Sequence, residues 1–373
     1  MTAFALSALV AAAAVLTDVR AQTTTSIEPL VDHTYPYSDV PYQVEPTGDE
    51  RGSQVGYNIC NSTTQNQDSY CQTLIVNEID DFCIYSSPDT NDTIGDSESY
   101  EVAWCTSDTH GTRLIPEGAL KGVQYIYTAN YIQIIGYIDQ TQVNLQADDA
   151  GGELDPHGSD LLGNPMGAIV YSNQYPRNNT DNSTYTQIIE WTEFIGNDMF
   201  CLKICNPANT SADNVGWCNN IYDEIGISYN CPNAAQNGTF EVCDGDSMTP
   251  VGVYTSDGQT YTWTQPYTGE LTIPYTPTIP ASSNCRTFAS TDLYTAKVST
   301  TASLGASSAT AVSSGASGDA SSGATSASSG ASRTGTSGSA SSTSTGTTSS
   351  AGAVRMSALA TFAGVAFMVA FLA

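Results

Sequence analysis

The densest group of chemically capable side chains is an acidic, glycine-spaced segment from Asp148 to Asp160. Its carboxylates are Asp148, Asp149, Glu153, Asp155 and Asp160. Calcium takes about six to eight oxygen ligands, so a loop of this composition could wrap that ion. The spacing differs from the D-x-[DN]-x-[DN]-G pattern of helix-flanked calcium loops, and a solvated acidic turn between two strands is the alternative. Calcium is therefore the one cofactor that the residues suggest.

Paired carboxylates are also typical of glycoside cleavage, in which one acid protonates the leaving oxygen and the other acts as nucleophile or base. The run Asn77–Phe82 resembles the E-x-D-x-x-E strand of laminarinase-type jelly rolls, with Glu78 and Asp80 in the first two acidic positions. Cys83 stands where the last glutamate is expected, so the second catalytic carboxylate is missing. No residue is therefore assigned as catalytic.

Serine and zinc hydrolase chemistry finds no support in the order of the residues. Gly245-Asp246-Ser247 resembles the nucleophile segment of Gly-Asp-Ser esterases, which need a histidine later in the chain. The histidines, His33, His110 and His157, all precede it, and none lies in an H-E-x-x-H zinc motif. We interpret them as ordinary surface or core residues.

Cysteines indicate how the chain is held together. An even number of them in a secreted chain indicates disulfides. The ten are Cys60, Cys71, Cys83, Cys105, Cys201, Cys205, Cys218, Cys231, Cys243 and Cys285. On a strand from Asp198 to Asn206, Cys201 and Cys205 would lie about 13 Å apart, beyond the roughly 7 Å that a disulfide spans. These two must have different partners, and the remaining connectivity is open.

The elements that carry these residues follow a β pattern. A Tyr/Ile run at 123–139, broken at 128–130, predicts two strands and a turn. Residues 253–263 predict a hairpin, because Asp257-Gly258 favours a two-residue turn. Further short strands are predicted at 168–171, 186–195, 199–204 and 224–229. The sequence thus predicts an all-β fold, a disulfide-stabilised sandwich or jelly-roll-like domain.

The amino-terminal end indicates secretion. Residues 4–16 form an apolar run, and Val19-Arg20-Ala21 is a small-x-small cleavage site. Residues 1–21 are therefore predicted to be a signal peptide, followed by an extracellular domain at 22–298.

The carboxy-terminal end indicates a lipid anchor. Residues 299–352 are almost wholly Ser, Thr, Gly and Ala, which predicts a disordered, O-glycosylated stalk. Residues 353–373 end in an uncharged apolar tail, and the combination predicts a signal for attaching a glycosylphosphatidylinositol (GPI) anchor. A retained membrane span is the alternative. Ser349 and Ser350 are the candidate attachment residues.

The charge of residues 22–298 limits the partners, since 36 Asp and Glu stand against 7 Lys and Arg. Such a surface repels nucleic acid and anionic lipid, so no nucleic-acid partner is expected. Sequons of the type N-x-Ser/Thr predict N-glycosylation in this domain. They begin at Asn61, Asn91, Asn178, Asn182, Asn209 and Asn237.

Several stretches resemble the macrophage-activating glycoproteins of basidiomycete fungi. They are Asp148–Tyr171, Trp191–Pro207, Gly216-Trp217-Cys218 and Ile221–Pro232. The resemblance covers most of the extracellular domain and fits both ends of the chain. It implies a GPI-type mannoprotein of the wall and capsule region, whose glycans are recognised by host mannose-binding receptors. It implies no catalytic residue.

Together these features predict a cell-surface glycoprotein, attached to plasma membrane or cell wall through a GPI anchor. Its expected role is structural, adhesive or wall-polysaccharide-binding, through exposed aromatics among its 21 Tyr and 4 Trp. The expected partners are wall polysaccharide, host lectin receptors that bind its glycans, and the membrane that holds its anchor. The protein is not expected to be an enzyme. The alternative is an extracellular glycosidase or transglycosylase, which needs two carboxyl groups about 5 to 9.5 Å apart in a cleft.

Overall fold

The structure is a computed structural model that describes residues 28–48, 51–176, 181–209 and 216–294. The predicted signal peptide, stalk and GPI signal lie outside these residues, as do Ser349, Ser350 and Asn178. The described chain consists mostly of strands in mixed sheets with few helices, which confirms the prediction of a strand-rich domain. Within the described ranges, no helix is both long and apolar enough to cross a membrane.

One sheet has six strands in the order β4-β3-β2-β1-β8-β9. Two neighbouring pairs, β1–β8 and β3–β4, run parallel, and the others run antiparallel. The strands are β1 (Thr73–Glu78), β2 (Asp81–Ser86), β3 (Val102–Cys105), β4 (Arg113–Leu114), β8 (Ile169–Ser172) and β9 (Thr186–Ile188). Parallel neighbours bring together segments that are far apart in the sequence, such as β1 and β8.

A second sheet has seven strands in the order β15-β12-β5-β6-β11-β10-β7. The predicted strand pair with a turn at residues 128–130 is confirmed, because β5 and β6 pair antiparallel around those residues. The strands are β5 (Leu120–Tyr127), β6 (Tyr131–Ile138), β7 (Gly152–Leu154), β10 (Trp191–Gly196), β11 (Met199–Cys205), β12 (Phe240–Gly245) and β15 (Ser282–Thr287).

One large hydrophobic core contains residues from both sheets. Phe82 of β2 stacks on Phe200 of β11 with ring centroids 6.2 Å apart. Tyr85 of β2 packs on Trp191 of β10 with centroids 5.4 Å apart. All four side chains are at most 1% exposed, and burying such side chains stabilises the fold by roughly 2 to 3 kcal/mol each.

The outer face of the seven-stranded sheet, opposite this core, is covered by residues 216–231, here called the cover segment. Cys218 and Tyr222 of this segment cluster with Tyr131 of β6. Cys231 clusters with Ile135 of β6. Because the face is covered, strands β6 and β11 are buried on both sides.

All ten cysteines form disulfides, which confirms the prediction from their even number. The pairs are Cys60–Cys71, Cys83–Cys105, Cys201–Cys231, Cys205–Cys218 and Cys243–Cys285. The two cysteines of β11 bind different partners, as the strand geometry requires. Both partners lie in the cover segment, so two disulfides tie that segment to the sheet.

The described helices are short: α1 (Ile94–Ser97), α3 (Gly226–Asn230), and the 3-10 turns η1 (Leu30–Asp32), η2 (Tyr37–Asp39), η3 (Gln140–Val143), η4 (Asp223–Ile225) and η5 (Ser290–Leu293). A capping interaction begins α1, because the Thr93 side chain accepts the Asp96 N–H. Glu98, which lines one of the hollows of the molecule, follows this short helix.

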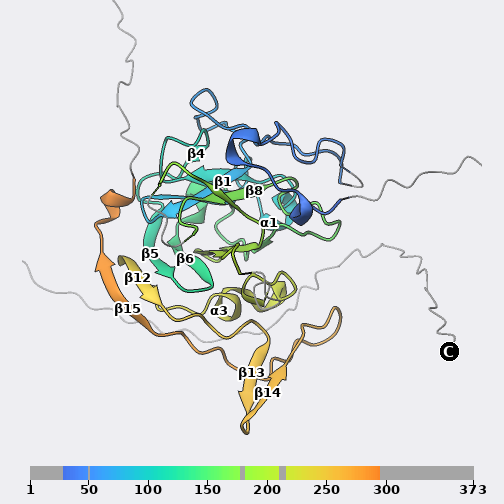
Figure 1. The fold of residues 1–373 in the computed structure, drawn as a ribbon, viewed down its shortest axis with the longest axis vertical. Helices are drawn as coiled ribbons and strands as arrows, with labels where there is room; N and C mark the ends of the chain where they lie inside the picture. Colours follow the sequence, from blue (N-terminus) through green and yellow to red (C-terminus); the bar gives the residue numbers. More distant parts are fainter. Residues whose placement is uncertain (1–27, 49–50, 177–180, 210–215, 295–373) are drawn as a thin grey trace, which may run out of the picture. The chain divides into compact units, whose positions relative to one another are not determined.

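The predicted hairpin at residues 253–263 is confirmed as β13 (Val253–Ser256) and β14 (Gln259–Thr262) (Figure 1). Its two turn residues, Asp257 and Gly258, have φ values of 50° and 74°. Both φ values lie in the left-handed region, as a type I′ turn requires.

One predicted strand is wrong, because residues 224–229 belong to η4 and α3, and Gly226, the first residue of α3, has a positive φ of 65°. The predicted strand at 186–195 is divided into β9 and β10, which belong to different sheets.

The run Asn77–Phe82 spans the turn between β1 and β2, because Glu78 ends β1, Asp81 begins β2, and these two residues pair with each other. Glu78 and Asp80 therefore do not alternate along one strand, so the likeness of this run to an E-x-D-x-x-E strand does not extend to its structure.

Candidate functional site

Two hollows lie beside the cover segment, and they differ in chemistry. The first has a volume of about 680 Å³ and is here called the acidic cleft. Its carboxylates are Glu98, Glu153, Asp155, Asp223 and Glu224. The second has a volume of about 440 Å³, is lined by no charged residue, and is here called the tyrosine groove. Its tyrosines are Tyr229, Tyr254 and Tyr275.

Glu153 is the most unusual residue of the acidic cleft. It pairs with Phe194, which pairs with Cys201, so all three side chains lie on the covered outer face of the sheet. Glu153 is 8% exposed, and within the described chain neither of its carboxylate oxygens has a hydrogen-bond partner. Burial raises the pKa of Glu153 well above its ordinary value, and Asp155 and Asp223 raise it further. The cleft wall thus holds a carboxyl group that favours its neutral form.

Lys203 lies on the same outer face, between the two cysteines of β11. It is fully buried, and burial lowers its pKa to about 7. Its Nζ donates to the backbone carbonyl of Asn230 and lies 3.1 Å from the Sδ of Met248. The Tyr131 ring centroid is 5.0 Å from Nζ. The charge of Glu153 acts in the opposite direction on the Lys203 pKa, so the two groups interact beneath the cover segment.

Asp155 is the second buried carboxylate of the acidic cleft. It is 6% exposed and accepts the backbone N–H groups of His157 and Gly158 at 2.7 and 2.9 Å. The Asn220 amide of the cover segment donates to it at 3.4 Å. Burial raises the pKa of Asp155, while these hydrogen bonds lower it. The bonds hold the carboxylate at the end of β7, where the chain turns.

The rim of the cleft is acidic and exposed. Asp223 and Glu224 of η4 are exposed, and Gln265 bonds to the Asp223 side chain and accepts the Glu224 N–H at 3.0 Å. Glu98 is half-buried, and burial raises its pKa. Tyr267, at 98% exposure, places an aromatic ring at the same rim.

The structure distributes the five predicted calcium ligands over separate interactions. Asp148 is exposed, and Asp149 accepts the N–H groups of Ile94 and Gly151. Asp160 forms a bidentate pair with Arg51 at 2.5 and 2.7 Å. Among the described residues, no three of the predicted carboxylates lie close enough together to share one ion. The calcium site stays a prediction, which this arrangement does not favour.

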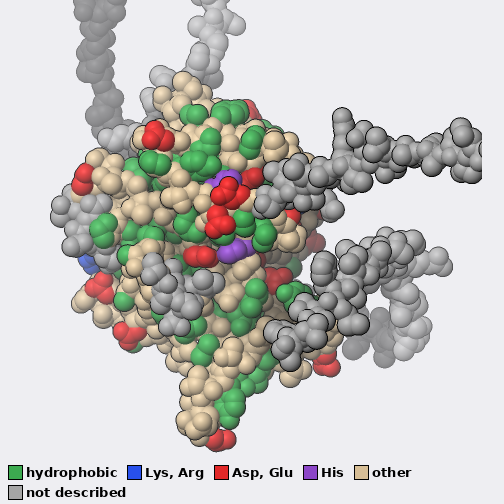
Figure 2. Space-filling view, turned by 45° about the vertical axis from the view of Figure 1, so that its right-hand side comes forward, with side chains coloured by type: hydrophobic (Ala, Val, Ile, Leu, Met, Phe, Trp, Pro, Cys, Tyr) green, Lys and Arg blue, Asp and Glu red, His purple; other side chains and the backbone are tan. Residues whose placement is uncertain are grey.

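The other predicted residues lie outside both hollows. Figure 2 shows Asp and Glu side chains gathered beside histidines on one face of the molecule. His157 lies 3.0 Å from Glu190, His33 lies 3.9 Å from Glu45, and buried His110 pairs with Asp81. None of the three histidines lines either hollow. The Ser247 hydroxyl bonds to Asn130 and Thr128.

The sequons within the described chain lie at or near the surface. Asn209 is half-buried, and the others are exposed. The exposed ones are Asn61, Asn91, Asn182 and Asn237. Glycosylation at these positions stays a prediction.

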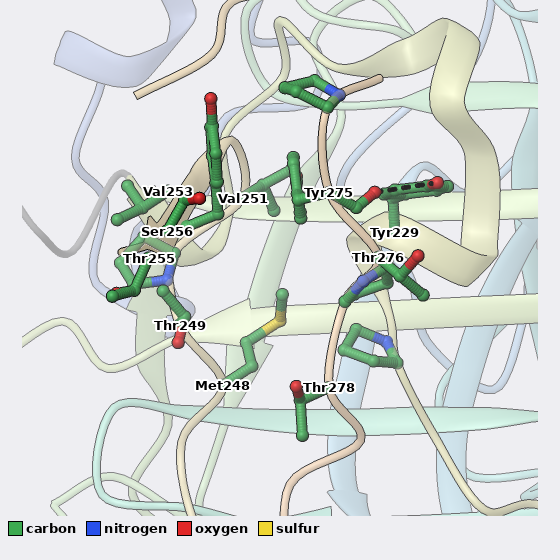
Figure 3. Close-up of a pocket in the computed structure, with 15 residues that line it drawn as sticks. Tyr229, Met248, Thr249, Val251, Val253, Thr255, Ser256, Tyr275, Thr276 and Thr278 are labelled. Atoms are coloured by element: carbon green, nitrogen blue, oxygen red, sulfur yellow. Dashed lines mark hydrogen bonds between the residues drawn. The ribbon is translucent and has the colours of Figure 1, made fainter. Parts of the chain in front are cut away.

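The tyrosine groove lies between two chain segments (Figure 3). Residues 249–256 line one side, and residues 274–278 line the other, with Met248 between them. Tyr254 and Tyr275 stack with ring centroids 5.3 Å apart and planes 4° apart. Threonines at positions 249, 255, 276 and 278 also line the groove. The groove thus combines flat aromatic surface with neutral hydrogen-bonding groups.

Hydrogen bonds hold the groove tyrosines in place. The Tyr229 hydroxyl donates to the Tyr275 carbonyl at 3.2 Å, as the dashed line in Figure 3 marks. The Tyr275 hydroxyl accepts the Gly252 N–H at 2.9 Å. Because the hydroxyls are bonded, the rings are pre-positioned and lose little freedom on binding a ligand.

Sequence reasoning named Glu153 and Asp155 but not their common cleft, and it missed the groove tyrosines. One signal was available, because the triplet Pro-Tyr-Thr occurs at 266–268 and again at 274–276. Its first copy places Tyr267 at the cleft rim, and its second places Tyr275 in the groove.

Comparisons with known proteins place the chain among fungal proteins. No family model and no solved structure matches it. The appressorium protein ROW1 of Mycosarcoma maydis is 40% identical over 232 residues, which are 62% of this chain and 51% of ROW1. The appressorium protein ROW2 of the same fungus is 37% identical over 246 residues, which are 65% of this chain and 79% of ROW2. The chain thus spans about half the length of ROW1 and most of ROW2, and it belongs to the family of these appressorium proteins.

Proposed function

We propose that the protein is an extracellular surface glycoprotein that binds polysaccharide of the cell wall in the tyrosine groove. The observation that carries this proposal is the parallel stack of Tyr254 on Tyr275 in an uncharged hollow rich in threonine. A sugar ring has apolar C–H faces and a rim of hydroxyl groups. A tyrosine likewise combines an apolar face with a polar tip, so the two surfaces match.

The chemistry of the groove favours a neutral chain over a charged one. Its lining residues include no Asp, Glu, Lys or Arg, although the protein as a whole has a net charge of −28. Neutral wall polysaccharides, such as glucan, chitin or mannan, are therefore the proposed ligands.

The proposed setting is the outer surface of a fungal cell. The predicted signal peptide, sequons and GPI signal support a GPI-anchored mannoprotein of sandwich or jelly-roll-like fold whose glycans are open to host lectins. The five disulfides suit an oxidising, extracellular compartment. Because the relatives are named appressorium proteins, we extend the proposal to the surface of the appressorium.

The test is sedimentation of the purified protein with insoluble glucan, chitin and mannan. The double variant Tyr254→Ala/Tyr275→Ala is expected to reduce bound protein at least about tenfold, since stacked aromatics dominate such contacts. Tyr42→Ala is the matched control. Tyr42 is 60% exposed and stacks on Tyr57, and neither of these two tyrosines lines either hollow. Equal binding of the double variant and the native protein would overturn the proposal.

A second candidate function is glycoside cleavage in the acidic cleft, as a glycosidase or transglycosylase. It is favoured by Glu153, whose raised pKa suits a general acid, beside Asp155 on the same chain segment. Release of new reducing ends from the same polysaccharides, lost in Glu153→Gln, would support it. Sedimentation without any release of reducing ends supports a binding protein instead.

A further inference from the structure

We infer that a proton on Glu101 fixes the short helix α1 against the core, and that loss of this proton at alkaline pH releases the helix. Glu101 lies between α1 and β3. Ile94 and Gly95 of α1, and Glu98 just after it, line the acidic cleft, so release of the helix opens one wall of that cleft. The inference does not depend on the tyrosine groove or its ligand.

The hydroxyl group of Ser97 shows where the proton lies. Ser97 Oγ is 2.8 Å from the backbone carbonyl oxygen of Thr93 and 2.8 Å from a carboxyl oxygen of Glu101. A serine hydroxyl donates one hydrogen, whereas a carbonyl oxygen or an ionised carboxylate only accepts. With an ionised Glu101, one hydrogen would serve two acceptors, and one of the two contacts would be repulsive. Protonated Glu101 satisfies both, because Ser97 donates to Thr93 and accepts from Glu101.

Burial makes the ionised form of Glu101 costly. The side chains of Glu101 and Ser97 are both 0% exposed. The second carboxyl oxygen of Glu101, Oε2, has no hydrogen-bond partner within the described chain. A carboxylate offers about four lone-pair positions, and a buried charge that leaves most of them empty is strongly destabilising. The neutral carboxyl group needs fewer partners and fits this site.

The charged groups that act on Glu101 are all acidic. Burial is the main cause of the raised pKa of Glu101, and the charges of Glu98, Asp92 and Asp149 raise it further. Asp92 precedes α1, Glu98 follows it, and Asp149 precedes β7. Burial also raises the pKa of Glu193 of β10, and the charge of Glu101 adds to that shift. No ion pair in the described ranges includes Glu101, so nothing offsets a negative charge there.

The segment around α1 is the part of this neighbourhood that can move. The helix has four residues, and a helix this short depends on its contacts for stability. Of residues 91–100, only Ile94 and Ser97 are buried. On the other side of Glu101, β3 is buried at all four positions and pairs with both β2 and β4. Exposing an ionised Glu101 to water therefore costs least when α1 moves and the sheet stays in place.

The direction of the pH effect follows from the two states of the helix. The pKa of Glu101 is raised from 4.5 to about 8 in the folded chain, and release of α1 returns it toward the lower value. The contribution of Glu101 to holding α1 is therefore complete below pH 4.5 and is lost as the pH rises through about 8. Between pH 6 and pH 9, this linkage raises the ratio of released to fixed helix on the order of 100-fold.

The test is hydrogen–deuterium exchange of the purified full-length protein at pH 6 and pH 9, read by mass spectrometry and corrected for the intrinsic effect of pH on exchange. Peptides that cover residues 92–101 are expected to lose protection at least tenfold at pH 9, while peptides from β5 and β6 keep theirs. Unchanged protection of residues 92–101, or an equal loss in β5 and β6, would overturn the inference.

Glu101→Gln tests the role of the proton directly. The glutamine amide donates to Ser97 Oγ as the neutral carboxyl group does, but it cannot ionise. This variant is expected to protect residues 92–101 equally at both pH values. Glu117→Gln is the matched control, because Glu117 is exposed and its variant should keep the native loss at pH 9. A loss in Glu101→Gln as large as that of the native protein would contradict the inference.

Further variants separate Glu101 from its neighbours. Ser97→Ala removes the acceptor of the proton and is expected to lower the protection of residues 92–101 at pH 6 at least fivefold. Unchanged protection in this variant would show that the contact does not hold the helix. Burial also raises the pKa values of Glu153 and Glu193, so Glu153→Gln and Glu193→Gln test whether the proton belongs to them. Both variants should retain the loss at pH 9, and its absence in either would assign the effect to that residue and overturn the inference.

Discussion

The acidic cleft and the tyrosine groove are built beside the same cover segment, yet they differ in almost every physical property. The cleft concentrates carboxylates, two of which are less than 10% exposed. The groove has no charged lining residue, and its polar groups are hydroxyls. Buried carboxyl groups therefore line the cleft but not the groove.

The two sites also differ in how their residues are satisfied. In the groove, the hydroxyls of Tyr229 and Tyr275 are hydrogen-bonded within the protein. In the cleft, the Glu153 carboxyl group has no hydrogen-bond partner in the described chain. A pre-organised groove needs little from its ligand beyond shape.

The largest expected effect comes from removing a disulfide that holds the cover segment, beside which both sites lie. The double variant Cys205→Ser/Cys218→Ser releases one end of the cover segment from β11. Loss of this cross-link, which has a sequence separation of 13, is expected to lower stability by about 3 kcal/mol. Chemical denaturation measures that change, and the affinity of the tyrosine groove for polysaccharide should fall with it. Retention of full affinity would show that the geometry of the groove does not depend on this disulfide.

The next effect separates a buried carboxylate of the core from one of the cleft. Burial raises the pKa of Glu101 from 4.5 to about 8, so the folded state keeps a proton that the unfolded chain releases. The contribution of Glu101 to stability therefore falls as pH rises from about 4.5 to about 8. Glu101→Gln is expected to add roughly 2 kcal/mol at pH 8 and little at pH 4, measured by urea unfolding.

Glu153→Gln sharpens that contrast. The pKa of Glu153 is also raised by burial, so this variant should likewise gain stability at pH 8. Unlike Glu101, however, Glu153 belongs to the cleft lining, so Glu153→Gln should abolish any release of reducing ends from polysaccharide while Glu101→Gln leaves it unchanged. Identical release by the two variants would contradict a catalytic role for Glu153.

Salt should have little effect on binding at the tyrosine groove. Raising the ionic strength from 0.1 M to 1 M shortens the screening length from about 10 Å to about 3 Å. Binding of neutral polysaccharide should then change less than about twofold, because no charged residue lines the groove. A loss of roughly fivefold or more would show that charge dominates binding there.

The smallest expected effect tests the pre-organisation of the groove. Tyr229→Phe removes the hydroxyl that donates to the Tyr275 carbonyl and is expected to cost about 0.5 to 1 kcal/mol in polysaccharide affinity. Tyr261→Phe is the matched control, because the Tyr261 ring stacks on Tyr254 while Tyr261 itself does not line the groove. A similar loss in both variants would show that the Tyr229 hydrogen bond has no special role.

The sequence by itself determined the local features of this protein. Short alternating runs predicted β5, β6, β8 and β11, because side chains on a strand point to alternate faces. Asp257-Gly258 predicted the hairpin turn, because few other residues adopt two successive left-handed conformations. An even number of cysteines predicted complete disulfide pairing, and strand geometry alone required separate partners for Cys201 and Cys205.

Only the tertiary structure decided which distant segments meet. Glu153 lies in one cleft with Glu98 and Asp223, because the sheet order brings β7 to an edge and two disulfides fold residues 216–231 over its outer face. The predicted strand at 224–229 failed for the same reason, since that segment packs on a sheet instead of joining one. Local patterns fix the direction of a side chain relative to its own backbone. Its burial, its charge state and its neighbours depend on contacts between residues far apart in the chain, which no short window of sequence contains.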